Sequence, residues 1–186
     1  MDVQGRHVKP SDWRFSPNRE SHLSRATDRE AALLSERTAP ERAVIFLPFQ
    51  FLPDIAIADV AFSAEATTLG GLFEAAAEAV TEVMVDRESL RPAVEREISM
   101  RGEDIERLLY DFLTEVIIIK DVDSLLFKVF SVDLDEDGPT LTCRMKGESI
   151  DRGRHKLRND VKAVTMHLFE VKKTALGWNT TVVLDI

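Results

Sequence analysis

Two segments of this chain repeat apolar residues at helical spacing, and segments that alternate as strands do surround both of them. Each apolar stripe must be buried against another layer of structure. Together they predict an α+β domain, with a mostly antiparallel sheet and two main helices packed on one face. The stripes are Leu69, Leu72, Phe73, Ala76, Val80, Val83 and Met84 in the first segment, and Ile105, Leu108, Leu109, Phe112, Leu113 and Val116 in the second.

Local signals mark where these elements begin. Thr68 can cap the first helix, and Gly102 leads into the second, which has the acidic pair Glu103-Asp104 where a helix dipole favours anions. The strand-like segments cover residues 44–52, about 55–66, 94–100, 125–134, 140–145, 161–171 and 178–184.

The first 43 residues differ from the rest in composition. They mix Ser, Pro, Arg, Asp and Glu, and their few apolar residues keep no period. Such a segment cannot bury enough apolar surface to offset its ordering entropy. We therefore expect residues 1–43 to be a disordered extension and residues 44–186 to form the folded domain.

The charge and the cysteine content of the chain exclude some classes of function. Residues 44–186 hold sixteen Lys/Arg and twenty-six Asp/Glu, a net −10, which disfavours direct nucleic-acid binding because phosphates are repelled. The single cysteine, Cys143, allows no internal disulfide. No apolar run approaches the roughly 20 residues that span a bilayer, and no signal core is present, so we expect a cytoplasmic protein with no membrane partner.

Acidic residues at strand ends suggest a cation site. Asp185 stands beside the α-carboxylate of Ile186 at the end of an alternating strand, and Asp59 interrupts another strand. If these strands are neighbours, three carboxylates converge and could hold a hard metal ion. The alternative is that both aspartates simply face water.

The charged segment 147–162 allows two interpretations, a solvated loop or a docking loop. It contains His155, but neither His155 nor His167 has the tight ligand spacing of a zinc site. We expect His167, inside a strand, to be half-buried and hydrogen-bonded. No nucleophile elbow or phosphate-binding glycine loop supports enzymatic chemistry.

Several of these motifs occur together in a characteristic order. They are residues 58–62, 68–69, 82–86, 101–113, 147–148 with Asp151 and His155, 161–165 with His167, and 183–186. In this order and spacing, the chain resembles the archease family over about residues 49–186. The chain departs from the family pattern before Asp59, where Ala56 and Ile57 replace a histidine and a threonine, and at Met166, which replaces an aromatic residue.

The resemblance implies a non-enzymatic accessory protein of an RtcB-type RNA ligase in tRNA splicing or RNA repair. Archeases promote the GTP-dependent guanylylation of that ligase and its multiple turnover, so RNA and GTP would be met only through the ligase. The family's metal-binding acids fall on Asp59 and on Asp185 with Ile186, and oxygen ligands favour Ca²⁺, Mg²⁺ or Mn²⁺. Lys162, and with less support His155 and His167, are candidate phosphate or partner contacts, although Lys162 could equally be a plain strand-edge lysine.

Two other functions fit the same residues. One is a stand-alone metal-dependent hydrolase that uses Asp59 and Asp185, which predicts turnover without a partner. The other is a metal-free interaction module or chaperone for an RNA-modifying enzyme, in which the acids could be replaced without loss of activity.

Overall fold

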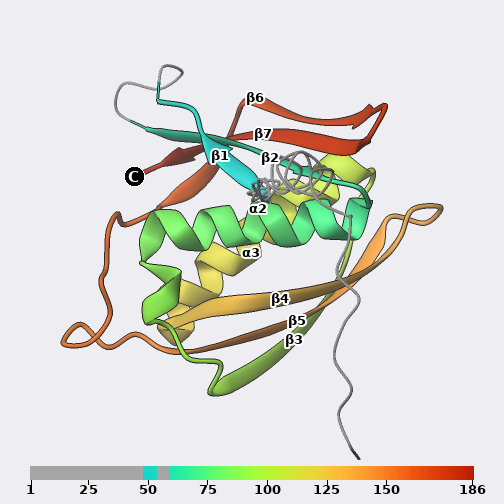
Figure 1. Ribbon diagram of the computed structural model, residues 1–186. Helices are drawn as coiled ribbons and strands as arrows, with labels where there is room; N and C mark the ends of the chain where they lie inside the picture. The colour runs from blue at the N-terminus through green and yellow to red at the C-terminus, as the bar shows by residue number, and fades with distance from the viewer. Residues whose placement is uncertain (1–47, 54–58) are drawn as a thin grey trace, which may run out of the picture. The chain divides into compact units, whose positions relative to one another are not determined.

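The computed structural model describes residues 48–53 and 59–186, which fold into strands and two α-helices (Figure 1). The expected extension 1–43, the start of the first strand and residues 55–58 lie outside these described residues. The elements are β1 (Phe49–Phe51), β2 (Val60–Ala66), α2 (Leu69–Met84), a 3₁₀ turn (Arg87–Ser89), β3 (Val94–Arg101), α3 (Ile105–Asp123), β4 (Leu125–Asp135), β5 (Thr140–Ser149), β6 (Ala163–Thr174) and β7 (Gly177–Asp185).

The described strands form two antiparallel sheets. One has the order β1-β2-β7-β6 and the other the order β3-β5-β4. Figure 1 shows α2 and α3 lying between the two sheets, so each sheet has one face covered by helices. The α+β class and the antiparallel pairing are confirmed, while the strands divide between two sheets rather than forming one.

Helix α2 is buried on more than its predicted stripe because it occupies the middle layer. Its stripe residues Leu72, Phe73 and Val80 are fully buried, and so are Ala77 and Ala79, which lie outside the stripe. Alanine side chains are short enough to let a helix approach a layer on each side. The two helices also meet through stacked rings of Phe73 and Phe112, whose centroids lie 5.9 Å apart.

The predicted helix starts are confirmed by their caps. The hydroxyl of Thr68 accepts a hydrogen bond from the Gly71 N–H at 3.1 Å, and the carboxylate of Asp104 accepts one from the Arg107 N–H at 2.7 Å. Asp104 is thus the cap residue of α3 rather than part of its first turn. These bonds satisfy donors that a helix N-terminus otherwise leaves unpaired.

Two strands differ from the sequence pattern. β5 continues to Ser149, so Gly147 and Glu148 belong to a strand and not to the following loop. β6 is interrupted between Thr165 and Glu170, where its register with β7 shifts, and Leu168 takes a positive φ of 56°. None of the helices in the described part of the chain is both long enough and apolar enough to cross a membrane.

Candidate functional site

The end of β7 lies between the beginnings of β2 and β6. In the β2–β7 ladder, Val60 pairs with Leu184. Asp59 directly precedes Val60 and Asp185 directly follows Leu184, so the two acids lie at the same end of this strand pair. The condition set by the sequence analysis, that these two strands are neighbours, is therefore met.

On the other side of β7, Lys162 contacts the last two residues. Its backbone N–H donates to the carbonyl oxygen of Asp185 at 2.8 Å, and its Nζ donates to the oxygen of Ile186 at 2.9 Å. The structure thus places Asp59, Asp185, Ile186 and Lys162 at one end of the β2-β7-β6 strands. The ammonium group of Lys162 therefore already donates a hydrogen bond to one of the candidate metal ligands, the Ile186 oxygen.

The chemistry of this strand end suits a hard cation. Carboxylate and carbonyl oxygens are the ligands of Ca²⁺, Mg²⁺ and Mn²⁺. Within residues 48–53 and 59–186, no group of three or more His, Cys, Asp or Glu side chains comes close enough to hold a metal ion. Two side-chain carboxylates and the Ile186 oxygen would leave coordination positions open to water or to oxygens of a partner.

His155 lies elsewhere, in a buried polar cluster. Its side chain is 0% exposed. Nδ1 accepts a hydrogen bond from the Asp151 N–H at 3.0 Å, which assigns the ring proton to Nε2, and Nε2 lies 3.0 Å from Glu148 Oε1. Both ring nitrogens are therefore occupied within the fold, and neither is open to a phosphate or a partner.

Glu148 is the centre of this cluster, and sequence reasoning did not single it out. Its carboxylate also accepts from the Arg91 N–H at 2.6 Å and from the guanidinium of Arg154. Burial alone would raise the pKa of Glu148, but the hydrogen bonds from Arg154, Arg91 and His155 outweigh it and lower the pKa to about 2. The carboxylate stays ionised and joins β5 to two loops.

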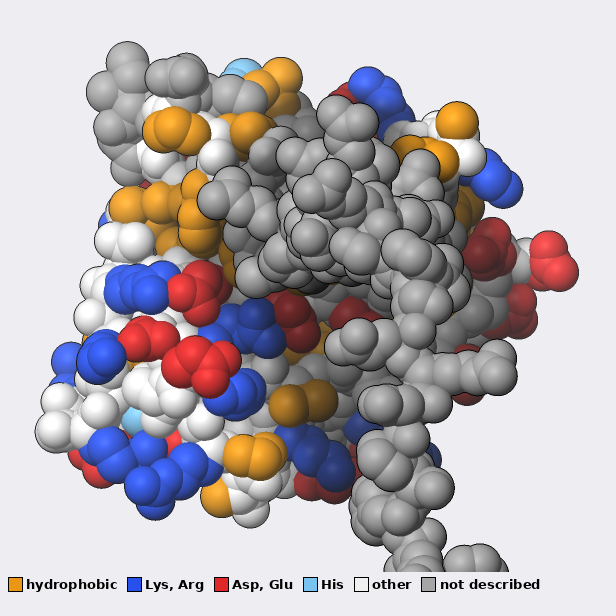
Figure 2. Space-filling view, viewed as in Figure 1, with side chains coloured by type: hydrophobic (Ala, Val, Ile, Leu, Met, Phe, Trp, Pro, Cys, Tyr) orange, Lys and Arg blue, Asp and Glu red, His pale blue; other side chains and the backbone are white. Residues whose placement is uncertain are grey.

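The loop between β5 and β6 is consequently anchored as well as charged. Figure 2 shows Lys and Arg side chains interspersed with Asp and Glu at the lower left, the region where Figure 1 places this loop. Lys156 pairs with Asp86 at 3.2 Å, and this contact, before any other cause, lowers the pKa of Asp86. The loop is a solvated charged surface over a buried polar centre.

His167 differs from its expectation. It is exposed, and it lies in the interrupted stretch of β6 between Thr165 and Glu170. No hydrogen bond of its ring is found among the described residues. The bulge turns this stretch away from the ladder, which a strict alternation of strand side chains does not anticipate.

Comparison with known proteins identifies the family. The model of the archease protein family (MTH1598/TM1083) matches residues 49–186. The chain belongs to the archease family. Archease from Methanothermobacter thermautotrophicus is 40% identical over 131 residues, which cover 69% of this chain and 93% of that protein. Archease from Pyrococcus abyssi is 35% identical over 132 residues, with the same coverage of 69% and 93%.

Solved archease-like structures share the fold. The solution structure of Methanobacterium thermoautotrophicum protein 1598 has a TM-score of 0.67 and 38% identity, and covers 75% of this chain and 99% of its own. A crystal structure from Thermotoga maritima, described as an archease and possible chaperone, has a TM-score of 0.53. At 20% identity, with 70% of this chain and 93% of its own covered, it supports the archease fold alone.

Proposed function

We propose that this archease-family protein is a non-catalytic accessory factor of an RtcB-type RNA ligase. It promotes guanylylation of the ligase from GTP and sustains multiple turnover in tRNA splicing or RNA repair. A divalent cation held by Asp59, Asp185 and Ile186 is part of this role. The observation that supports the proposal is the β2–β7 ladder, which starts with Val60 opposite Leu184 and so brings the adjacent Asp59 and Asp185 to one strand end, in a chain that belongs to the archease family.

The chain's own residues would act by presenting charge at an exposed strand end. Asp59 is exposed and Asp185 is half-buried, so their carboxylates can be reached from solvent. A bound divalent cation supplies positive charge that can neutralise GTP phosphates and orient the α-phosphate. Lys162 would turn from the Ile186 oxygen towards a phosphate or a partner carboxylate when that oxygen becomes a ligand.

The experiment measures ligase guanylylation. The full chain is added in amounts well below those of a cognate RtcB-type ligase, with GTP and Mn²⁺ or Mg²⁺, and covalently bound guanylate is followed over time. We expect the wild type to accelerate guanylylation, and the chain alone to consume neither GTP nor RNA. Asp185→Asn and Asp59→Asn should lose most of the stimulation.

A matched control removes a charge of the same kind elsewhere. Asp133 is an exposed acid on β4, in the other sheet, so Asp133→Asn should stimulate as well as the wild type. Equal stimulation by all variants would support the metal-free chaperone instead. Turnover of RNA or nucleotide by the isolated chain would support the hydrolase.

A further inference from the structure

The two outer strands of the β3-β5-β4 sheet differ in how their free edges are covered. On β4, the Val132 N–H donates to Glu74 Oε1 at 2.8 Å, and Arg87 donates to the Lys128 carbonyl oxygen at 3.0 Å. Side chains of α2 and the 3₁₀ turn therefore occupy the outer edge of β4. On β3, the backbone pairs with β5 on one side, and no partner for its other side is found among the described residues.

This open edge of β3 is long and regular. Its residues are exposed except for Ile98 and Met100, which are half-buried. The strand contains no proline or bulge, two devices that prevent edge-to-edge pairing, and the charges of its outer face, a third such device, are of both signs. Its one inward-facing charge, Arg96, is neutralised by Asp123 at 2.6 Å. Such an edge offers a row of unpaired N–H and C=O groups to another strand.

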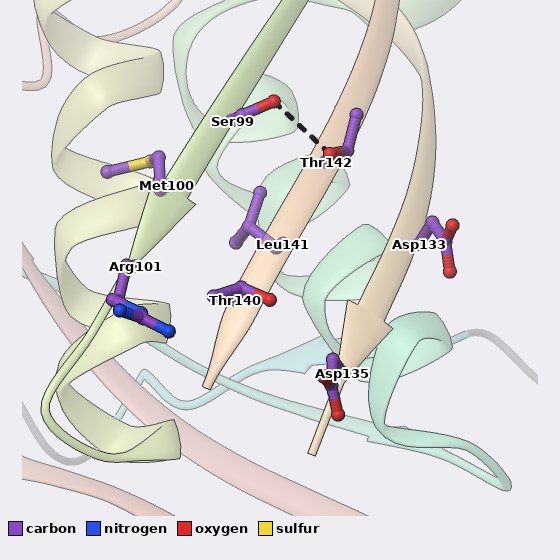
Figure 3. Close-up of a pocket in the computed structure, with 8 residues that line it drawn as sticks. All are labelled: Ser99, Met100, Arg101, Asp133, Asp135, Thr140, Leu141 and Thr142. Atoms are coloured by element: carbon purple, nitrogen blue, oxygen red, sulfur yellow. Dashed lines mark hydrogen bonds between the residues drawn. The ribbon is translucent and has the colours of Figure 1, made fainter. Parts of the chain in front are cut away.

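The side chains of β3 divide cleanly between the two faces of the sheet. Figure 3 shows Ser99 hydrogen-bonded to Thr142, at 3.2 Å, and Met100 on the side of α3. Because strand side chains alternate, the outer face carries Glu95, Glu97, Ser99 and Arg101, and the helix side carries Arg96, Ile98 and Met100.

The strand is complementary to itself in the antiparallel direction. We infer that β3 pairs with β3 of a second copy of this chain across a two-fold axis at Ile98, which goes beyond the proposed function. This register joins residues 95–101 of both copies and keeps outer-face residues next to outer-face residues. Glu95 then lies opposite Arg101 of the partner subunit, and by symmetry this ion pair forms twice.

Other positions of the two-fold axis also keep outer-face residues next to outer-face residues, but they give less favourable pairings. An axis at Glu97 sets this residue opposite Glu97 of the partner subunit, so like charges meet. An axis at Ser99 pairs a shorter stretch, residues 97–101. The axis at Ile98 gives the longest pairing without a like-charge contact, and it sets Ile98 beside Ile98 of the partner subunit on the helix side.

Apolar surface on α3 supports the same interface. Ile118 and Val122 lie one turn apart on α3 and are 45% and 75% exposed. The next residue, Asp123, contacts Arg96 of β3, so this end of α3 lies beside the open edge. A strand added to β3 would cover part of this helix. One strand pair is a small contact, so the dimer should depend on protein concentration.

Charge exchange tests the ion pairs. Sedimentation velocity on the full chain over a concentration series should show a monomer–dimer equilibrium for the wild type. Glu95→Arg sets two arginines opposite each other, and Arg101→Glu sets two glutamates opposite each other, so each should weaken dimerisation roughly tenfold. The double variant Glu95→Arg/Arg101→Glu restores opposite charges and should dimerise almost as the wild type does.

The control for this exchange is Glu97→Arg. Both glutamates form an ion pair with β5 of their own chain, Glu97 with Arg144 at 2.7 Å and Glu95 with Lys146 at 3.4 Å. Across the inferred interface they differ, because Glu97 lies opposite the uncharged Ser99 of the partner subunit. Its replacement should change dimerisation far less than Glu95→Arg does, and melting curves check that every variant folds. A wild type that stays monomeric at all concentrations, or a double variant as weak as the single ones, would overturn the inference.

A cross-linking experiment tests the register directly. Ile98→Cys places two thiols opposite each other at the axis, within the Cα spacing that a disulfide needs. Met100→Cys meets Arg96 of the partner subunit, so its own thiols are too far apart. Because Ile98 lies directly opposite Cys143 in the β3–β5 ladder, both variants are made in a Cys143→Ala background, which prevents a disulfide within one chain, and melting curves check that this background folds. Under mild oxidation, Ile98→Cys should give a covalent dimer and Met100→Cys should not. Equal cross-linking of both variants, or of neither, would contradict this register.

Discussion

The carboxylate of Glu148 and the imidazole of His155 form a buried hydrogen bond of 3.0 Å between a strand and the loop that follows it. Arg154 and the backbone of Arg91 complete the shell of this carboxylate. An ionised group that is satisfied in this way links β5, the β5–β6 loop and the segment before β3. Its removal should therefore affect stability in a manner that depends on pH.

Glu148 should make the protein sensitive to acid. The fold lowers the pKa of Glu148 from 4.5 to about 2, so the folded state favours the ionised form. The resulting stability is fully present above about pH 4.5 and is lost as the pH falls towards 2. Asp86 and Asp160, whose pKa values are also lowered, act in the same direction.

Glu148→Gln tests this contribution. At pH 7 it should lower the free energy of unfolding by about 2 kcal/mol, because hydrogen bonds to a charged group are lost. It should also make the fall in stability between about pH 4.5 and 2 shallower. Urea unfolding at a series of pH values measures both effects. An unchanged pH dependence in the variant would show that Glu148 is not the group responsible.

The proposed cation binding at the strand end can be measured in the absence of any ligase. Calorimetric titration of Ca²⁺ and of Mn²⁺ into the full chain should reveal a site that is lost in Asp59→Ala and Asp185→Ala. Asp133→Ala serves as the control because it removes an acid from the other sheet. Identical heats in all four proteins would exclude this site.

Lys162 should weaken that cation site, because its Nζ rests on the Ile186 oxygen. Lys162→Met removes the ammonium and keeps a similar length of side chain. We expect tighter Ca²⁺ binding by a few-fold, measured in the same titrations, while the melting temperature stays nearly constant since the lysine is exposed. Weaker binding in the variant would contradict this competition.

Residues 1–43 should contribute little to the stability of the domain. Their composition does not provide a core, whereas the described part of the chain has its own buried cluster. Deletion of residues 1–43 should shift the melting temperature by only the few degrees that about 1 kcal/mol represents for a domain of this size. A fall of ten degrees or more would show that the segment packs against the domain.

Gly147 should tolerate no side chain. A Cβ at Gly147 would lie 1.9 Å from the Leu126 carbonyl oxygen, where β4 and β5 pair closely. Gly147→Ala should therefore destabilise the fold by about 2 kcal/mol or more, as other overpacked positions do. Gly138→Ala is the control, because the nearest atom to its Cβ would be 3.9 Å away. Chemical denaturation compares the two, and similar losses would contradict the steric explanation.

Elements that depend on neighbouring residues could be predicted from the sequence alone. The stripes of α2 and α3, the cap at Thr68 and most strand positions followed from spacing and from hydrogen bonds within a few residues, whereas Asp104, expected in the first turn of α3, is its cap residue. The family resemblance was also present in the sequence, because the order of several motifs carries it, and the family model confirms it. The pairing of β2 with β7 was stated as a condition and is now observed.

Features that depend on residues far apart in the chain could not be predicted in this way, because they follow from how the layers pack. Division of the strands between two sheets, burial of Ala77 on the second side of α2, enclosure of His155 by Glu148 and exposure of His167 all belong here. Local spacing specifies which face of a helix or strand is apolar, but it does not specify which other elements cover that face. Strand pairing and side-chain burial depend on contacts between elements that are distant in the sequence, so they are defined only when the layers pack together.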